Sequence, residues 1–326
     1  MGVFRSFSAL TIGALVSVTL AGVVPTPPDA GPGRPGTVAA ADPGRVVAAP
    51  EPLRTAREVR RYWTRARMAA AVPIEELVPS LSASTSGAGA DAPRRTPERA
   101  GVRTPRTTGK LFFNVDGGAA VCSAAAIKTE KRNQVITAGH CVHTGPNPGG
   151  ILLPPDPHFY SDWLFVPRYR NGAAPFGRWV ANGAWAFTGW IENESFKFDQ
   201  AIISFKKRNG RRLVDQVGGN EVVWGKDQRQ WGTRIWGWPA EFPYDGETPQ
   251  RCDGRTVPFE NSADAAMNNC DMNGGASGGP WLLPRGRTAN TGRIWAVTSR
   301  RVIGEPILLA RPLPREIRRM IRSANR

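Results

Sequence analysis

The chain has 326 residues, and its 43 Lys and Arg against 27 Asp and Glu give a formal net charge of +16. The arginines are scattered among Ala, Pro and Gly instead of forming a basic stripe, so we expect no nucleic-acid partner. The chain has four cysteines, none in a Cys-x-x-Cys pair, and three histidines. This pattern does not match the usual zinc sites, so we do not expect a zinc protein. We therefore expect neither a metal nor another cofactor.

Residues 1–41 have the composition of a secretory signal region. Arg5 precedes an apolar run over 9–21, and small residues allow cleavage after position 21 or after position 41. A membrane anchor is the alternative, but the run is shorter than a transmembrane span. We expect a secreted, extracellular protein without stable membrane insertion once the signal is removed.

Residues 42–109 predict a pro-segment with little order. The region is rich in Pro, Ala, Gly and Arg, and it carries one amphipathic stretch, 54–77, which is a small core for its length. Basic residues near its end offer processing sites: Arg94, Arg95, Arg103 and Arg106.

Residues 110–326 predict an all-β domain. Ten of the eleven tryptophans lie beyond Lys110, and short apolar or alternating runs are separated by Gly, Pro and Asn. The length suffices for a double six-stranded antiparallel β-barrel, divided near 206–220. A basic helix is predicted over 314–324, and we expect it to dock on the second barrel. The expected strands are 111–115, 119–127, 134–137, 179–187, 200–205, 221–224, 233–238, 280–283, 294–299 and 306–310.

The chain has three histidines, so few residues can serve as the base of a catalytic serine. A serine hydroxyl becomes an effective nucleophile when a neutral imidazole can take its proton and a carboxylate orients that imidazole. His140 follows the apolar run 135–138 and precedes Cys141, which indicates a fixed position at the end of a strand. His143 and His158 have no such setting, and we expect them in exposed loops.

Two further segments supply the remaining groups. Ser277 lies in the Gly-rich stretch 273–281, where glycines allow a tight turn that can aim the amides of Gly275 and Ser277 at a developing oxyanion. Asp199 opens the apolar run 200–205, which predicts a buried carboxylate. We therefore predict that Ser277 is the nucleophile and that Asp199 orients the imidazole.

Chain order excludes two competing enzyme classes. Residues 275–279 also fit the G-x-S-x-G pattern of α/β-hydrolases, but there the histidine follows the serine, and no histidine follows His158 in this chain. A papain-like cysteine enzyme fails for the same reason, because its histidine follows the cysteine at long range.

The segments 137–141, 199–202 and 274–280 resemble the His, Asp and Ser motifs of trypsin-like serine peptidases, in the same order. The resemblance extends over 111–323 and is closest to the secreted bacterial branch that includes the glutamyl endopeptidases. It implies a chymotrypsin-like double β-barrel, made as a zymogen, with the catalytic triad in the cleft between the barrels.

An oxidising compartment predicts that the four cysteines form disulfides. Three pairings are possible, and the sequence-local one joins Cys122 to Cys141 and Cys252 to Cys270; the resemblance places a bridge beside the histidine on the first pair. Ala276 replaces the aspartate that precedes the nucleophile in animal trypsins, so activation by an ion pair with a new N-terminal amine is not available. We expect loss of the pro-segment to unblock the site instead.

The substrate-binding residues are predicted less directly. Asp271 stands six residues before the predicted nucleophile, as the basic-specific aspartate of trypsins does, and Thr298 lies near the place where glutamyl-specific relatives carry a histidine. With the adjacent Ser299 these are our candidates for substrate contacts, and Arg300 or Arg301 is an alternative acid-binding group. The preference for acidic, basic or apolar residues stays open.

These features predict a secreted serine endopeptidase that cleaves protein or peptide substrates as a monomer, through an acyl-enzyme. One alternative is a catalytically silent trypsin-like barrel that binds cell-wall polymer or protein with its basic, Trp-rich surface. Another is an esterase on the same fold.

Overall fold

A computed structural model describes residues 42–78, 103–146, 156–284 and 291–326. Every described residue lies in one compact unit, Ala41–Arg326. The predicted signal region and the Arg94-Arg95 processing site fall outside the described residues.

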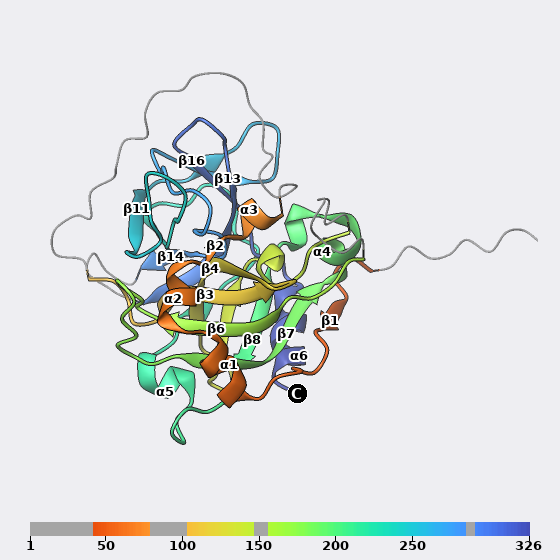
Figure 1. The fold of residues 1–326 in the computed structure, drawn as a ribbon. Coiled ribbons are helices and arrows are strands. Elements are labelled where there is room, and N and C mark those ends of the chain that lie inside the picture. Colours follow the sequence, from red (N-terminus) through yellow and green to blue (C-terminus); the bar gives the residue numbers. More distant parts are fainter. Residues whose placement is uncertain (1–41, 79–102, 147–155, 285–290) are drawn as a thin grey trace, which may run out of the picture. The chain divides into compact units, whose positions relative to one another are not determined.

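Strands dominate this unit (Figure 1). They are β1 (Val46–Ala48), β2 (Val72–Pro73), β3 (Thr108–Val115), β4 (Gly118–Ile127), β5 (Gln134–Thr137), β6 (Ser161–Pro167), β7 (Trp179–Phe187), β8 (Ala201–Phe205), β9 (Glu221–Val222), β10 (Thr233–Gly237), β11 (Gln250–Gly254), β12 (Val257–Pro258), β13 (Ala265–Asn268), β14 (Pro280–Pro284), β15 (Gly292–Arg301) and β16 (Ile307–Pro312). The helices are α1 (Ala56–Tyr62), α2 (Arg65–Ala69), α3 (Ile74–Leu77), α4 (Thr188–Asn193), α5 (Leu213–Val217) and α6 (Ile317–Ala324), with 3₁₀ turns η2 (Gly139–Cys141) and η3 (Phe196–Phe198).

The first sheet closes into a six-stranded barrel. Strands β7, β6, β3, β4, β5 and β8 follow one another in space, and β8 pairs back with β7. These strands are almost wholly buried, and side chains from them form one core that includes Leu111, Phe165 and Ile203. The barrel therefore provides a rigid support for the turns that leave its strand ends.

The second sheet has the order β11-β10-β14-β15-β16-β13-β12, with β9 beside β15. No pairing between β11 and β12 closes it within the described residues, so it forms a half-barrel. The segment 206–220 connects the two sheets. The predicted all-β double barrel is confirmed, with the difference that one barrel is closed and the other open.

Two disulfides join strands to neighbouring turns. Cys122 of β4 bonds to Cys141 of η2, and Cys252 of β11 bonds to Cys270 just after β13. The sequence-local pairing is therefore the one present, and the first bridge fixes the backbone next to His140.

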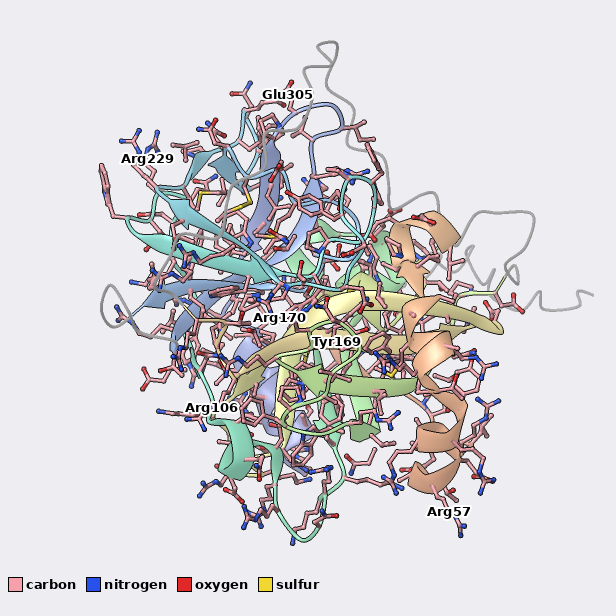
Figure 2. All side chains as sticks on the ribbon, turned by 60° about the vertical axis from the view of Figure 1, so that its left-hand side comes forward. Arg57, Arg106, Tyr169, Arg170, Arg229 and Glu305 are labelled. Carbon is pink, nitrogen blue, oxygen red and sulfur yellow. A yellow bond between two sulfur atoms is a disulfide. The ribbon has the colours of Figure 1, made fainter. Side chains whose placement is uncertain are left out.

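The N-terminal segment differs from its prediction. The sequence predicts little order over 42–109, whereas residues 42–78 are folded onto the first barrel. β1 pairs antiparallel with β7, and β2 pairs parallel with β4. Its three short helices follow one another along one side of the molecule (Figure 2). Packing explains the order, because Trp63 is fully buried and donates from Nε1 to the carbonyl of Asp162 at 2.8 Å.

The C-terminal helix also differs from its prediction. It begins at Ile317, and it packs against β7 and β8 of the first barrel instead of docking on the second sheet alone. Its buried residues Ile317, Met320 and Ala324 join a cluster supplied by both sheets, so the helix helps hold the two together. Among the described residues, no helix combines the length and apolarity needed to cross a bilayer.

Candidate active site

His140 lies in η2, the turn that follows β5. Its Nδ1 lies 3.1 Å from Asp199 Oδ1 and 3.0 Å from Oδ2, and its backbone N–H donates to Asp199 Oδ1 at 2.9 Å. Both residues are buried. The carboxylate therefore fixes both the backbone and the ring of the histidine, and it leaves Nε2 directed elsewhere.

Asp199 caps η3 at the start of β8, and its side chain is fully buried. A third donor, the Ser299 hydroxyl, bonds to Asp199 Oδ2 at 2.7 Å. Ser299 occupies an irregular position of β15, where the register with β16 shifts between Thr298 and Arg300. Such a bulge redirects a side chain, here toward the carboxylate.

The Ser277 turn depends on glycines at two positions. Gly275 and Gly278 have φ of +90° and +78°, a region that side chains with a Cβ seldom adopt. A Cβ at position 278 would lie 2.0 Å from Thr137 Oγ1, so only glycine allows the turn to approach the first barrel. Ser123 of β4 completes the junction by donating from its N–H to the Ser277 carbonyl at 2.7 Å.

The His140–Asp199 pair shifts both pKa values. Burial lowers the pKa of His140, but the charge and hydrogen bond of Asp199 and the charge of Glu75 outweigh it, so the pKa lies above its ordinary value. Burial raises the pKa of Asp199, but His140 and the Ser299 hydrogen bond outweigh it, so the pKa lies below its ordinary value. The carboxylate thus stabilises positive charge on the ring, which is the charge that His140 carries after it accepts a proton.

An unexpected carboxylate contacts Ser277. Glu75 of α3 accepts a hydrogen bond from the Ser277 hydroxyl through Oε1, and it accepts one from the Gly275 N–H through Oε2 at 3.3 Å. Glu75 Oε1 also lies 3.9 Å from His140 Nε2. One carboxylate therefore lies beside all three groups.

The histidine and the serine are not hydrogen-bonded to each other in this arrangement. His140 Nε2 has no hydrogen-bond partner in the part of the chain that the structure describes, and the Ser277 hydroxyl points to Glu75. The predicted oxyanion donor Gly275 N–H is engaged by the same carboxylate, and the other predicted donor, the Ser277 N–H, belongs to the same turn.

A small pocket adjoins Ser277. Its volume of about 20 Å³ holds about one water molecule, so a substrate side chain has no room while Glu75 is present. Its lining comes from three segments and α3, and comprises Glu75, Asn273, Gly274, Ser277, Thr298, Arg300, Arg301 and Leu308.

Of the three predicted substrate-contact residues, only Thr298 lines this pocket. Thr298 lines the pocket, although its hydroxyl accepts from Trp281 Nε1 at 3.0 Å. Asp271 does not line it, and its buried Oδ2 has no hydrogen-bond partner among the described residues. The Ser299 hydroxyl donates to Asp199 Oδ2 at 2.7 Å, and a contact of Ser299 with substrate stays a prediction.

The two arginines beside the pocket are both paired. Arg300 contacts the buried Asp264, which also forms an ion pair with Arg311 at 2.8 Å. Arg301 Nη1 lies 2.5 Å from Glu241 Oε2.

The other histidines differ from the predicted exposed loops in part. His143 is buried, accepts from the Gly145 N–H at 3.0 Å and has its pKa lowered to about 4 by burial. His158 is partly exposed and lies 3.1 Å from Asp116. The sulfur atoms of Cys122 and Cys141 approach His140, but they are bonded to each other and offer no thiolate to a metal.

Two residues of the site were not predicted from the sequence in these roles, Glu75 and Ser299. Neither lies in a recognisable motif, because each reaches the site through tertiary structure. An acidic pair, Glu75-Glu76, at the end of the amphipathic stretch was the one available signal.

Comparison with known proteins identifies relatives by structure. No family model matches the chain, and no curated protein matches it. Protease Anisep from Arthrobacter nicotinovorans is 30% identical with a TM-score of 0.60, and the match covers 68% of this chain and 97% of that one. The thermostable serine protease AL20 from an extremophilic microorganism is 25% identical with a TM-score of 0.59, over 67% and 96% of the two chains. A Glu endopeptidase shares the fold at 16% identity, with a TM-score of 0.53 over 72% and 97%.

Proposed function

Because this chain belongs to the trypsin-like bacterial serine proteases of chymotrypsin fold, we propose that it is a secreted endopeptidase in which His140, Asp199 and Ser277 form the catalytic triad. The proposal rests chiefly on one observation. The buried His140–Asp199 pair leaves Nε2 without a hydrogen-bond partner among the described residues, and that nitrogen and the Ser277 hydroxyl lie beside the same carboxylate oxygen of Glu75. Two disulfides agree with an extracellular location.

The reaction proceeds in two halves. Once Glu75 has left, Ser277 Oγ attacks the peptide carbonyl carbon while His140 Nε2 takes the hydroxyl proton, and the N–H groups of Gly275 and Ser277 stabilise the oxyanion. The C–N bond then breaks, and His140 returns the proton to the leaving amine. Asp199 holds the ring and stabilises its positive charge throughout.

Water completes the cycle. His140 takes a proton from the water that attacks the acyl-enzyme, and the ester bond to Ser277 breaks to release a carboxylic acid product. The proton then returns to Ser277 Oγ. Protein or peptide is therefore the substrate, and the pocket lined by Thr298, Arg300 and Arg301 is where its side chain enters.

Substitution of the nucleophile tests this function. In the chain freed of its N-terminal segment, Ser277→Ala should reduce casein hydrolysis by about 10⁴-fold or more, because the attacking oxygen is lost. Ser161→Ala, at an exposed serine of β6, is the matched control and should retain full activity. Equal activity of the Ser277→Ala variant would refute the assignment, and a folded wild-type chain inactive on casein and on ester substrates would favour the silent-barrel alternative.

A further inference from the structure

Glu75 has no part in the proposed reaction, although it contacts the groups that carry it. We propose that Glu75 is the inhibitory residue of the N-terminal segment, and that residues 42–78 remain an inhibitor after the chain is cut downstream of them, until they dissociate or are degraded. This inference rests on the proposed function. It names the group that must leave before the site can act.

The first effect of Glu75 is on the nucleophile. A serine hydroxyl has a single proton to donate, and in this structure Glu75 Oε1 accepts it. His140 Nε2, which must take that proton, has no hydrogen-bond partner among the described residues. The arrangement therefore separates the base from the proton that it needs.

The second effect is on the oxyanion donors. Glu75 Oε2 accepts from the Gly275 N–H at 3.3 Å, where a developing oxyanion would accept it. A carboxylate places negative charge at this position, as the transition state does, so the site's own preference for an oxyanion favours the inhibitor. A substrate carbonyl cannot reach this donor while Glu75 is bound.

The geometry also protects the segment from attack at the point of contact. The group beside Ser277 Oγ is a side-chain carboxylate and not a peptide bond, and the carbon of a carboxylate is a poor electrophile. The surrounding backbone forms the helical turn α3, closed by the Val78 N–H bonding to the Ile74 carbonyl at 2.9 Å. Glu75 therefore behaves as an inhibitor and not as a substrate.

Close packing holds α3 in place. Ile74 and Val78 are fully buried in the core of the first barrel, and β2 pairs with β4 through Val72 and Pro73. A Cβ at position 274 would lie 2.9 Å from Pro73 Cβ, so the Gly-rich turn of the site itself packs against the segment.

These anchoring contacts do not depend on an intact chain. The barrel contacts of β1, α1, α2, β2 and α3 are made by residues 46–78 themselves. A cut at Arg94, Arg95, Arg103 or Arg106 lies downstream of every one of them. Cleavage alone therefore leaves the carboxylate in the site.

The test measures reactivity of the unprocessed and the cut chain. Full-length wild type, Glu75→Ala, Glu75→Gln and Glu76→Gln are treated with a fluorophosphonate, and intact mass spectrometry follows the adduct on each species separately. Loss of the charge-assisted bonds should make full-length Glu75→Ala react about 10- to 100-fold faster than wild type. Glu75→Gln keeps the side-chain volume and should lie between them. The exposed neighbour Glu76 gives the matched control, expected to behave as wild type.

In a second arm, each chain is cut with trypsin. Its reaction with the fluorophosphonate is measured directly after the cut, and again after gel filtration in mild denaturant has removed the segment and the chain has been refolded. Cut wild type should stay slow until the segment is separated, whereas cut Glu75→Ala should react at once. Equal rates for full-length wild type and both Glu75 variants would overturn the inference, and slower Glu75 variants would assign Glu75 to catalysis. If the separated, folded wild type forms no adduct, the proposed function itself fails.

Discussion

At the scale of single residues, the burial of the Asp199 carboxylate has to be compensated, because this side chain is fully buried. A fully buried carboxylate is costly unless it is paired and hydrogen-bonded. Asp199 meets this condition with donors from His140 and with the Ser299 hydroxyl at 2.7 Å. Ser299 is therefore a positioning residue for the carboxylate and, through it, for the imidazole.

Removal of this hydroxyl gives a testable result. Ser299→Ala should lower the stability of the folded chain by about 1.5–3 kcal/mol, the usual loss for a hydrogen bond to a charged group. The same hydrogen bond lowers the pKa of Asp199, so that pKa should rise in the variant. A more basic Asp199 carboxylate also stabilises the positive charge on the His140 ring more strongly, so the pKa of His140 should rise with it. The acid-side loss of kcat follows protonation of that ring, and it should therefore begin at a higher pH than in wild type.

The pH profile separates positioning from simple loss of structure. Because its folded pKa is depressed, Asp199 contributes stability that is present above its unfolded pKa and lost as the pH falls through the folded value. Ser299→Thr keeps the hydroxyl and should restore the wild-type profile. A Ser299→Ala enzyme with a lower kcat but an unmoved acid limb would contradict the positioning role.

The sequence allowed the triad residues to be proposed, because His140, Asp199 and Ser277 each sit in a local pattern of small or apolar neighbours. It could not indicate Ser299 or Glu75 in the same way. Ser299 contacts Asp199 because the register of β15 is irregular at this point, and Glu75 contacts Ser277 across 202 positions of sequence. Neither contact is marked by a pattern in the neighbouring sequence.

At the scale of elements, local pattern predicted most strands but not the order of the N-terminal segment. Helices of four to seven residues are unstable alone, so α1, α2 and α3 depend on packing that propensity does not report. β6, β11, β12 and β13 were also not predicted. Polar residues in β11, as in its Gln-Arg-Cys-Asp-Gly sequence, hide the alternation that would mark a strand.

The segment's largest anchor offers a prediction at this scale. Trp63 is fully buried and packs 5.5 Å, between ring centroids, from Phe112. Trp63→Ala should weaken docking of the segment by about 3–5 kcal/mol and so increase fluorophosphonate labelling of the full-length chain, although Glu75 is unchanged. Arg60→Ala, on the exposed face of α1, is the control. Labelling at the wild-type rate would show that α3 holds its place without the rest of the segment.

At the scale of the whole molecule, the site exists because two sheets meet. His140 and Asp199 come from the first barrel, Ser277 comes from the second sheet, and Ser123 joins them. The Ser123 hydroxyl donates to the Gly275 carbonyl at 2.9 Å and accepts from the Trp238 N–H at 2.9 Å. The double barrel was predictable from the spacing of short strands, whereas the open edge of the second sheet was not, since closure depends on pairing between distant strands.

Covalent labelling tests the central claim most directly. The folded chain, separated from residues 42–78, is treated with a fluorophosphonate, digested and mapped by mass spectrometry, in parallel with a His140→Ala variant and a urea-unfolded sample. We predict one adduct, on Ser277, in the folded wild type and almost none in the other two samples. An adduct on another serine, or labelling of Ser277 that is as fast in His140→Ala or in urea, would contradict a catalytic triad at this site.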